Sequence, residues 1–376
     1  MAVSSYNSGP QQSVEYVDFG NPRRPGRPRV YWLLLACILI AATVIAVRHP
    51  GRARKPVQVP VTVSDFGRPL LGIRQGWELF GLDAAGVVAI QLARGRVVRT
   101  ALPPPVGDGP VSFIVGPRSA IIRPEDNVPG YLVPDNRPAQ PLTGVLARGG
   151  LLLPGPEEGQ EWDTAGGSNS LVLVGADGRP TSTRITLPDG NWPSESAMSD
   201  GRGEVLVASG SSGRQYDAGP HSLRPVAALL TAVGPSRWLG MTCPRGICRN
   251  VVVNPVTGSQ HKLPGPSVPL RTWPWPEFPG SVAPDGLTAA VVVSRGKVQV
   301  ALEQVNMVTG AVKPIGVPVN QNASSQTMVW SPDSQWLFVL DASGKLLAVN
   351  MRTGKVQSLG IPLPDFSQLA IRSAAG

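Results

Sequence analysis

The stretch from residue 326 to residue 362, QTMVWSPDSQWLFVLDASGKLLAVNMRTGKVQSLGIP, constrains the fold of this chain more than any other. Four runs rich in β-branched and aromatic residues are separated by three turn segments, SPDS, ASG and RTG. Ser, Pro, Asp and Gly favour turns because they adopt turn dihedral angles or hydrogen-bond the local backbone. The stretch therefore predicts one antiparallel sheet of four short strands. Such a sheet cannot bury both of its faces alone, so we expect copies of it on either side.

Copies of this unit can be counted from the glycine that closes its third turn. Gly354, Gly310 and Gly258 each follow a threonine, at intervals of 44 and 52 residues. The next two intervals towards the N-terminus are about twice as long, so each of them spans two copies of the unit. The third turns counted in this way lie at Gly95, near residue 137, and at Gly178, Gly219, Gly258, Gly310 and Gly354. A repeat of roughly 40 to 50 residues with four strands predicts an all-β, seven-bladed β-propeller, with six or eight blades as alternatives.

Two turns of this repeat carry a resemblance to a known family. WSPDSQWLFVL (330–340) resembles the W-S-P-D-G-x-x-L-A-F turn and strand of TolB-like and related WD-repeat propellers, SVAPDGLTAAVVV (281–293) repeats it, and AMSDGRGEVLVAS (197–209) is a weaker copy. Asp285 and Asp333 hold equivalent places in two blades, so we expect them to form turns rather than a catalytic pair. A basic N-terminus, one apolar stretch and a degenerate propeller also resemble the membrane-anchored propeller proteins of actinobacteria.

The N-terminal part of the chain differs from the repeats. Residues 1–29 have few apolar clusters and end in NPRRPGRPR, which predicts a disordered basic tail. Residues 30–47 are eighteen residues without a charge. As a helix they would extend about 27 Å, close to the thickness of a bilayer core. We expect one transmembrane helix there, with a cleaved signal peptide or a buried core helix as alternatives. Residues 48–60 would be a stalk rich in Pro and Arg, and residues 61–376 the propeller.

Basic residues flank both ends of the predicted span, so their distribution does not decide its orientation. Cys243 and Cys248, with four residues between them, are the only cysteines outside the span. We expect a disulfide, with free thiols or metal ligation as alternatives; zinc would need four ligands, and only His261 is near in sequence. Because disulfides persist in oxidising compartments, the pair predicts a cell-membrane protein with a cytoplasmic N-terminus and an extracytoplasmic propeller.

The net charge of +9 does not predict nucleic-acid binding. Eight of the 34 basic residues and two of the 25 acidic residues lie in residues 1–56, which leaves a net charge of +3 for the remainder. The excess lies beside the predicted span, where anionic lipids attract it. The propeller shows no basic stripe interleaved with aromatic residues, so we expect no nucleic-acid partner.

The most aromatic stretch of the propeller is SVPLRTWPWPEFPG (267–280). Its aromatic residues Trp273, Trp275 and Phe278 lie among prolines, which stiffen the chain. Such a loop can present a platform to a carbohydrate or a peptide at little cost in entropy. The alternative interpretation is that these side chains only fill the space between neighbouring blades.

A second candidate is the acidic segment PGPEEGQEWDTAGGSN (154–169). Glu157, Glu158, Glu161 and Asp163 lie in what the sequence indicates is one long loop before the third blade. The loop is either a solvated insertion or a ligand or cation loop. It lacks the alternating oxygen ligands of ordered calcium loops, so we expect no metal site there.

Ring closure needs a strand from one end of the propeller to join the sheet at the other end, because an open sheet edge invites aberrant pairing. Residues 69–73, PLLGI, read as the first strand of the first blade. Residues 57–63 and 366–372 are left over at the two ends, and either could close the ring.

Catalytic motifs are nearly absent. The chain has three histidines and no nucleophile elbow, phosphate-binding glycine loop or His-Glu pair with metal spacing. We therefore expect no cofactor, and a non-catalytic binding, scaffold or sensor module for a protein, peptide or glycan partner. The alternative is an envelope enzyme of the propeller type, a hydrolase, lyase or quinoprotein. Three or more carboxylates or arginines at the channel mouth would favour the enzyme, and small and apolar residues the binding module.

Overall fold

The computed structural model describes residues 60–103, 111–124, 130–143, 150–164, 169–175, 178–188, 197–208, 214–265, 280–295, 299–319 and 325–373. They belong to the second of two compact units, Gln58–Gly376. The predicted tail, the predicted span and all of the stalk except Pro60 lie outside them. The helices described are η1 (Leu70–Gly72) and η4 (Pro244–Gly246), and none is long and apolar enough to cross a membrane.

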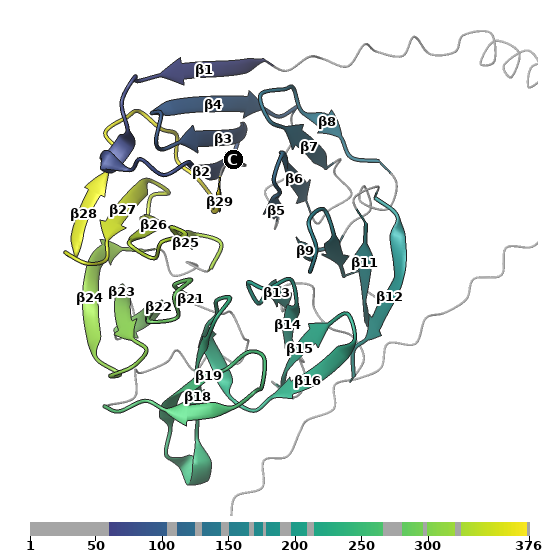
Figure 1. The fold of residues 1–376 in the computed structure, drawn as a ribbon, viewed down its shortest axis with the longest axis vertical. Coiled ribbons are helices and arrows are strands. Elements are labelled where there is room, and N and C mark those ends of the chain that lie inside the picture. Colours follow the sequence, from purple (N-terminus) through teal and green to yellow (C-terminus); the bar gives the residue numbers. More distant parts are fainter. Residues whose placement is uncertain are drawn as a thin grey trace, which may run out of the picture. The chain divides into compact units, whose positions relative to one another are not determined.

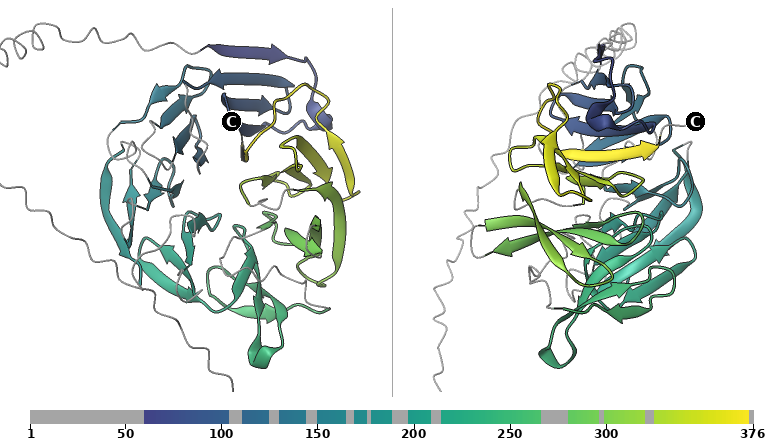
Figure 2. Two further views of the ribbon diagram at one scale, coloured as in Figure 1. Left: turned by 180° about the vertical axis from the view of Figure 1, so that it is seen from behind. Right: turned by 60° about the vertical axis from the view of Figure 1, so that its left-hand side comes forward.

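The described strands form seven antiparallel sheets arranged around a central axis (Figure 1). The view from behind shows the same radial arrangement (Figure 2, left). Six sheets have four strands and one has five. The fold is a seven-bladed β-propeller, which confirms the predicted fold class and the blade count of seven. We number the blades 1 to 7 in chain order.

The strands of each blade are given from the centre of the ring outward. Blade 2 contains β5 (Val111–Val115), β6 (Ser119–Pro124), β7 (Tyr131–Pro134) and β8 (Gln140–Pro141). Blade 3 contains β9 (Leu152–Pro154), β10 (Glu161–Asp163), β11 (Ser170–Val174) and β12 (Pro180–Thr186). Blade 4 contains β13 (Ala197–Ser199), β14 (Val205–Ala208), β15 (Gln215–Gly219) and β16 (Ser222–Val226). Blade 5 contains β17 (Leu229–Ala232), β18 (Trp238–Thr242), β19 (Arg249–Val253) and β20 (Gln260–Lys262). Blade 6 contains β21 (Gly280–Val282), β22 (Thr288–Arg295), β23 (Gln299–Asn306) and β24 (Val312–Pro318). Blade 7 contains β25 (Met328–Trp330), β26 (Trp336–Leu340), β27 (Leu346–Asn350) and β28 (Lys355–Ser358).

Blade 1 closes the ring with strands from both ends of the propeller. From the centre outward it contains β29 (Gln368–Ser373), β2 (Trp77–Asp83), β3 (Gly86–Gln91), β4 (Arg96–Ala101) and β1 (Val61–Asp65). The C-terminal strand β29 pairs with β2, and the N-terminal strand β1 pairs with the outer edge of β4. The sequence left open which terminal segment joins this sheet, and the structure uses both.

The prediction that residues 69–73 form the first strand of blade 1 is wrong. Residues 70–72 form the short helix η1, in which Leu71 and Gly72 have φ angles of 57° and 73°. An extended strand cannot include two such residues in succession. The innermost place in blade 1 is filled instead by β29, which aligns six residues with β2.

The third turns explain the glycine period of the sequence. In blades 5, 6 and 7 this turn begins at Asn254, Asn306 or Asn350, whose side-chain oxygen accepts hydrogen bonds from backbone N–H groups two or three residues later. The glycine four residues after the asparagine has a φ angle of 69° to 74° in all three. Glycine adopts this angle without steric cost, which is why it recurs.

Seven clusters of buried apolar side chains occupy the interfaces between neighbouring blades of the described structure. Strand side chains alternate between the two faces of a sheet, so each blade contributes to the cluster on either side. In β18, Trp238 belongs to the cluster shared with blade 4 and Leu239 to the cluster shared with blade 6. The core is therefore a ring of inter-blade layers.

The prediction of one long acidic loop over residues 154–169 is wrong. Its middle part is β10, the second strand of blade 3, which pairs with β9 and β11. Trp162 is fully buried against blade 4, and its Nε1 donates to the carbonyl oxygen of Gly203 at 2.8 Å. Burial of so large a side chain favours a place in the sheet over a place in a loop.

Candidate functional site: the central cavity

A cavity of about 330 Å³ lies where the innermost strands of the seven blades meet. We call it the central cavity. Every blade contributes to its wall, through the innermost strand or the residues beside it. One wall residue from each of blades 1 to 7 is, in order, Leu369, Phe113, Leu152, Met198, Val233, Val282 and Met328.

The wall of the central cavity is apolar with a few neutral polar groups. The polar side chains in it are Ser112, Ser199, Ser281, Ser325, Gln326 and Gln368. None of the wall residues within the described ranges carries a charged side chain. A cavity of this size and composition matches the general character of ligand pockets, which are mostly apolar with a small number of polar groups that fix orientation.

Several polar groups of the wall join neighbouring inner strands. Gln368 in blade 1 donates from Nε2 to the carbonyl oxygen of Val111 in blade 2 at 2.7 Å. Ser112 Oγ accepts the backbone N–H of Leu152 in blade 3 at 2.8 Å. Trp330 Nε1 donates to the carbonyl oxygen of Ser281 at 3.2 Å. These bonds fix the wall before any ligand arrives, which lowers the entropic cost of binding.

The structure separates the four predicted acidic residues. Glu157 and Glu158 are exposed in the turn before β10, whereas Glu161 and Asp163 are buried in the strand itself. Asp163 pairs with Arg123 of blade 2 at 2.9 Å. Removal from water raises the pKa of Glu161 to about 7. The four residues therefore do not form one ligand loop.

The aromatic residues Trp273, Trp275 and Phe278 lie outside the described residues, in the segment between β20 and β21. The prediction that they form a binding platform stays a prediction.

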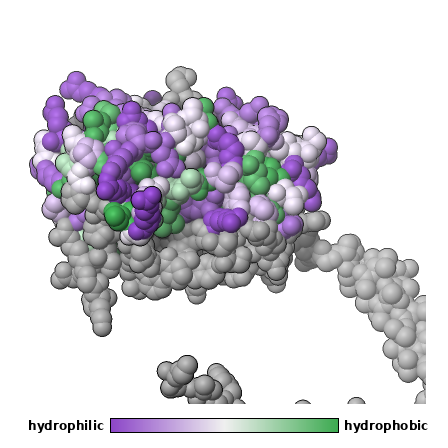
Figure 3. Space-filling view, turned by 90° about the horizontal axis from the view of Figure 1, so that it is seen from below, coloured by the Kyte–Doolittle hydropathy of each residue, from purple (hydrophilic) through white to green (hydrophobic). Residues whose placement is uncertain are grey.

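The predicted disulfide between Cys243 and Cys248 is present. It closes the connection between β18 and β19, which extends outward from the ring (Figure 1). Residues 243–249 are all exposed, and Ile247 is 60% exposed. On the side of the ring that contains this connection, hydrophobic residues form separate small patches among hydrophilic ones (Figure 3).

The predicted turn residues have structural contacts. Asp285 Oδ1 accepts the backbone N–H of Leu287 at 2.9 Å, and Asp333 Oδ1 accepts that of Gln335 at 3.0 Å. Gly310 and Gly354 close third turns with φ angles of 71° and 74°.

The residues that sequence reasoning missed are those of the cavity wall. Their only signal is membership of the innermost strand of each blade, which the counted repeat could have indicated.

No protein-family model and no curated protein sequence matches the chain. Three solved structures illustrate what it is similar to. A functionally unknown protein from Desulfotomaculum acetoxidans is 11% identical with a TM-score of 0.49, over 78% of this chain and 98% of that one. TolB from Acinetobacter baumannii is 11% identical with a TM-score of 0.39, over 75% and 79%. Virginiamycin B lyase from Staphylococcus aureus is 10% identical with a TM-score of 0.44, over 75% and 97%.

Identities this low show at most a shared fold. The three structures include an enzyme and a protein of unknown function, so they do not distinguish a catalytic role from a binding role. Fold alone does not determine function, and the function is therefore argued from the residues of this chain.

Proposed function

We propose that this chain is a non-catalytic binding module that acts as a scaffold or sensor at the cell envelope and receives part of a partner in the central cavity. The supporting observation is the cavity wall, to which all seven blades contribute and in which no described side chain is charged. General acid–base catalysis needs a titratable group beside the substrate. The described wall offers a surface for binding, and nothing in it favours the enzyme alternative.

The composition of the wall suggests the chemistry of the partner. Phe113, Leu153, Met198, Met328 and Trp330 supply apolar surface. Serine hydroxyl groups and glutamine amides can pair with the N–H and C=O groups of a peptide. The best match is a peptide or protein loop with an apolar side chain at its tip, and a glycan is the alternative.

The proposed location follows from features at the two ends of the chain. We place the propeller outside the cytoplasm, joined to the cell membrane by residues 30–47, with the N-terminus in the cytoplasm. The apolar stretch of residues 30–47 supports the anchor. The disulfide between Cys243 and Cys248 supports an oxidising compartment for the propeller.

One experiment tests both the location and the cavity. A cysteine replaces Ser325 in the cavity wall or, as the matched control, exposed Ser222 on β16 at the rim of blade 4. Intact cells that contain either full-length variant are treated with a membrane-impermeant photoactivatable maleimide and then illuminated. Both variants should be labelled, and only the Ser325→Cys variant should form a discrete cross-linked species on a denaturing gel.

The labelling of each variant is compared with that of the unsubstituted chain, because the native cysteines can also react with the maleimide and give a background. Labelling only after cell lysis would show that the propeller lies inside the cell. Labelling without cross-linking at residue 325, or equal cross-linking from both positions, would contradict the role of the central cavity.

A further inference from the structure

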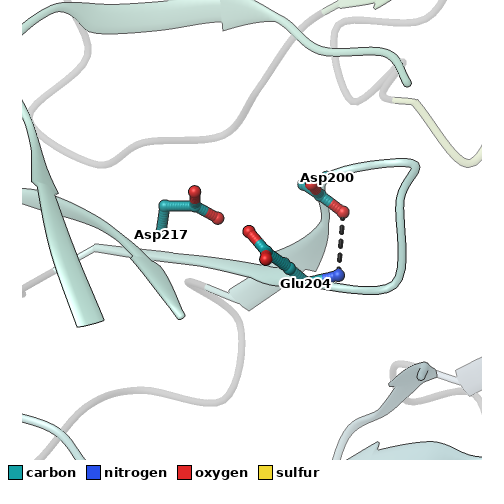
Figure 4. A group of neighbouring side chains, drawn as sticks. All are labelled: Asp200, Glu204 and Asp217. Atoms are coloured by element: carbon teal, nitrogen blue, oxygen red, sulfur yellow. Dashed lines mark hydrogen bonds between the residues drawn. The ribbon is translucent and has the colours of Figure 1, made fainter. Parts of the chain in front are cut away.

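Three carboxylates meet in blade 4, outside the cavity wall. Asp200 and Glu204 lie in the turn between β13 and β14, and Asp217 lies in β15. One oxygen atom of each residue lies within 4.8 Å of the others. Figure 4 shows the carboxylates of Glu204 and Asp217 pointing towards one another, with that of Asp200 on the other side of Glu204. We call this group the blade 4 cluster.

Two of the three carboxylates are buried and have oxygen atoms without a hydrogen bond. Asp200 is 0% exposed; its Oδ1 accepts the backbone N–H groups of Arg202 and Glu204, at 2.7 and 2.9 Å, but its Oδ2 has no hydrogen-bond partner among the described residues. Asp217 is 2% exposed, and its Oδ1 is buried in the same way. Buried polar atoms are rarely left without a partner, so these oxygens point to a further ligand.

The cations around the blade 4 cluster do not neutralise it. Arg224 on β16 forms an ion pair with Asp217 and lies 3.5 Å from Glu204. Arg202 lies 3.8 Å from Asp200 and 3.9 Å from Glu204. Among the residues that the structure describes, two arginines face three carboxylates, which leaves their balance negative. Burial raises the pKa of both Asp200 and Asp217.

Arg224 also has partners outside the blade 4 cluster. It donates from Nη1 to the carbonyl oxygen of Val256 at 2.6 Å and from Nη2 to that of Pro255 at 2.9 Å, both in blade 5. A cation that displaced Arg224 from Asp217 would therefore not leave its guanidinium group without acceptors.

We propose that Asp200, Glu204 and Asp217 bind one divalent cation, Ca²⁺. The donors are all carboxylate oxygens, which hard cations prefer, and the cluster contains no Cys or His that would favour zinc. Two oxygens on one Ca²⁺ can lie up to about 5 Å apart, so oxygens within 4.8 Å of one another can share it after small side-chain rotations. Water would complete the coordination shell.

The proposal does not depend on the proposed function. Asp200 lies between Ser199 and Gly201, which belong to the wall of the central cavity. A bound cation would therefore hold the turn that forms part of that wall.

Isothermal titration calorimetry of the full-length protein with CaCl₂, repeated with MgCl₂, tests this site. We expect one saturable Ca²⁺ site per chain, tighter for Ca²⁺ than for Mg²⁺, and a higher Tm with CaCl₂ than with EDTA. Asp217→Asn should weaken Ca²⁺ binding on the order of tenfold or more. The matched control is Asp341→Asn in blade 7, an aspartate that accepts the backbone N–H groups of Ser343 and Lys345 and lies outside the cluster.

The control should bind Ca²⁺ as the unsubstituted chain does. If Asp217→Asn fails to fold, Glu204→Gln, at a partly exposed position, gives the same test. Absence of saturable binding up to millimolar CaCl₂, or unchanged binding in both cluster variants, would overturn the proposal. So would a gain in stability of Asp217→Asn without any Ca²⁺ binding to either chain, because the cluster would then hold a proton instead.

Discussion

Glu161 places a carboxylate where the equivalent position of blade 7 has an aliphatic side chain. In both blade 3 and blade 7 a backbone hydrogen bond closes the turn between the first and second strands. The carbonyl oxygen that accepts it belongs to Trp336 in blade 7 and to Gln160 in blade 3, so these two residues are equivalent. The next residue is Leu337 in blade 7 and Glu161 in blade 3, and both are buried. Desolvation by burial accounts for the raised pKa of Glu161.

This residue should make stability depend on pH. The pKa of Glu161 rises from 4.5 to about 7 on folding, so between these values the unfolded chain releases a proton that the folded chain keeps. The free energy of unfolding therefore falls as pH rises through this window, by roughly 3 kcal/mol at most. Glu161→Gln should remove this contribution and leave that of Asp200 and Asp217, whose pKa values burial also raises. Urea unfolding of both chains at pH 4.5 and pH 8 measures the difference. Glu158→Gln, at an exposed position of the preceding turn, is the control; an equal loss of pH dependence in both variants would contradict the assignment.

The roles of such residues could not be predicted from the sequence. Glu157, Glu158, Glu161 and Asp163 look alike in a linear reading, and only the burial of Trp162 draws two of them into a strand. The blade 4 cluster shows the same limit. Asp200 and Glu204 are neighbours in sequence, but Asp217 joins them only because β15 pairs with β14.

At the level of elements, the third turns are the feature that the sequence predicted best. They are built from short-range contacts, since the asparagine side chain and the glycine that follows belong to the same five residues. These local contacts recur in blades 5, 6 and 7, so their period survives there although the strands differ in sequence. The asparagine of the turn was missed, although Asn254, Asn306 and Asn350 repeat at the same distance from the glycine.

Two of these glycines should respond differently to the same substitution. A Cβ atom at Gly310 would overlap the carbonyl oxygen of Pro264, whereas at Gly354 the nearest atom is the flexible end of Lys313, at 3.3 Å. Gly354→Ala should cost about 1 kcal/mol for its positive φ angle alone. Gly310→Ala should cost about 1–3 kcal/mol more, because backbone must move. Urea unfolding of the two variants gives the comparison, and equal costs would show that the overlap is relieved without strain.

At the scale of the whole molecule, the blade count could be predicted from the sequence, and the way in which the ring closes could not. The choice of β29 as the inner strand depends on pairing between residues 77–82 and 368–373, which no local pattern encodes. Arg372 of β29 reinforces this pairing: it donates from Nε to Glu78 of β2 at 2.7 Å and pairs with Asp135 of blade 2, also at 2.7 Å. The closing strand therefore joins two blades at once.

The two terminal strands of blade 1 should differ in importance. Deletion of residues 368–373 removes the inner strand with buried Leu369, and deletion of residues 61–65 removes an outer strand whose residues are mostly exposed. We expect the first deletion to abolish a single cooperative thermal transition, because it opens the ring. The second should lower the free energy of unfolding by on the order of 1–2 kcal/mol. Calorimetry of both chains measures this, and similar losses would show that β1 is also needed for closure.

Because β29 pairs with β2, blade 1 is the last blade to be completed during synthesis of the chain. A ribosome makes the chain from its N-terminus, so the segment that completes blade 1 emerges after every other described strand. Until then the inner edge of β2 has backbone groups without a partner, and such edges recruit other chains. A product that ends between β28 and β29 would carry six complete blades and one sheet edge open to pairing with other chains.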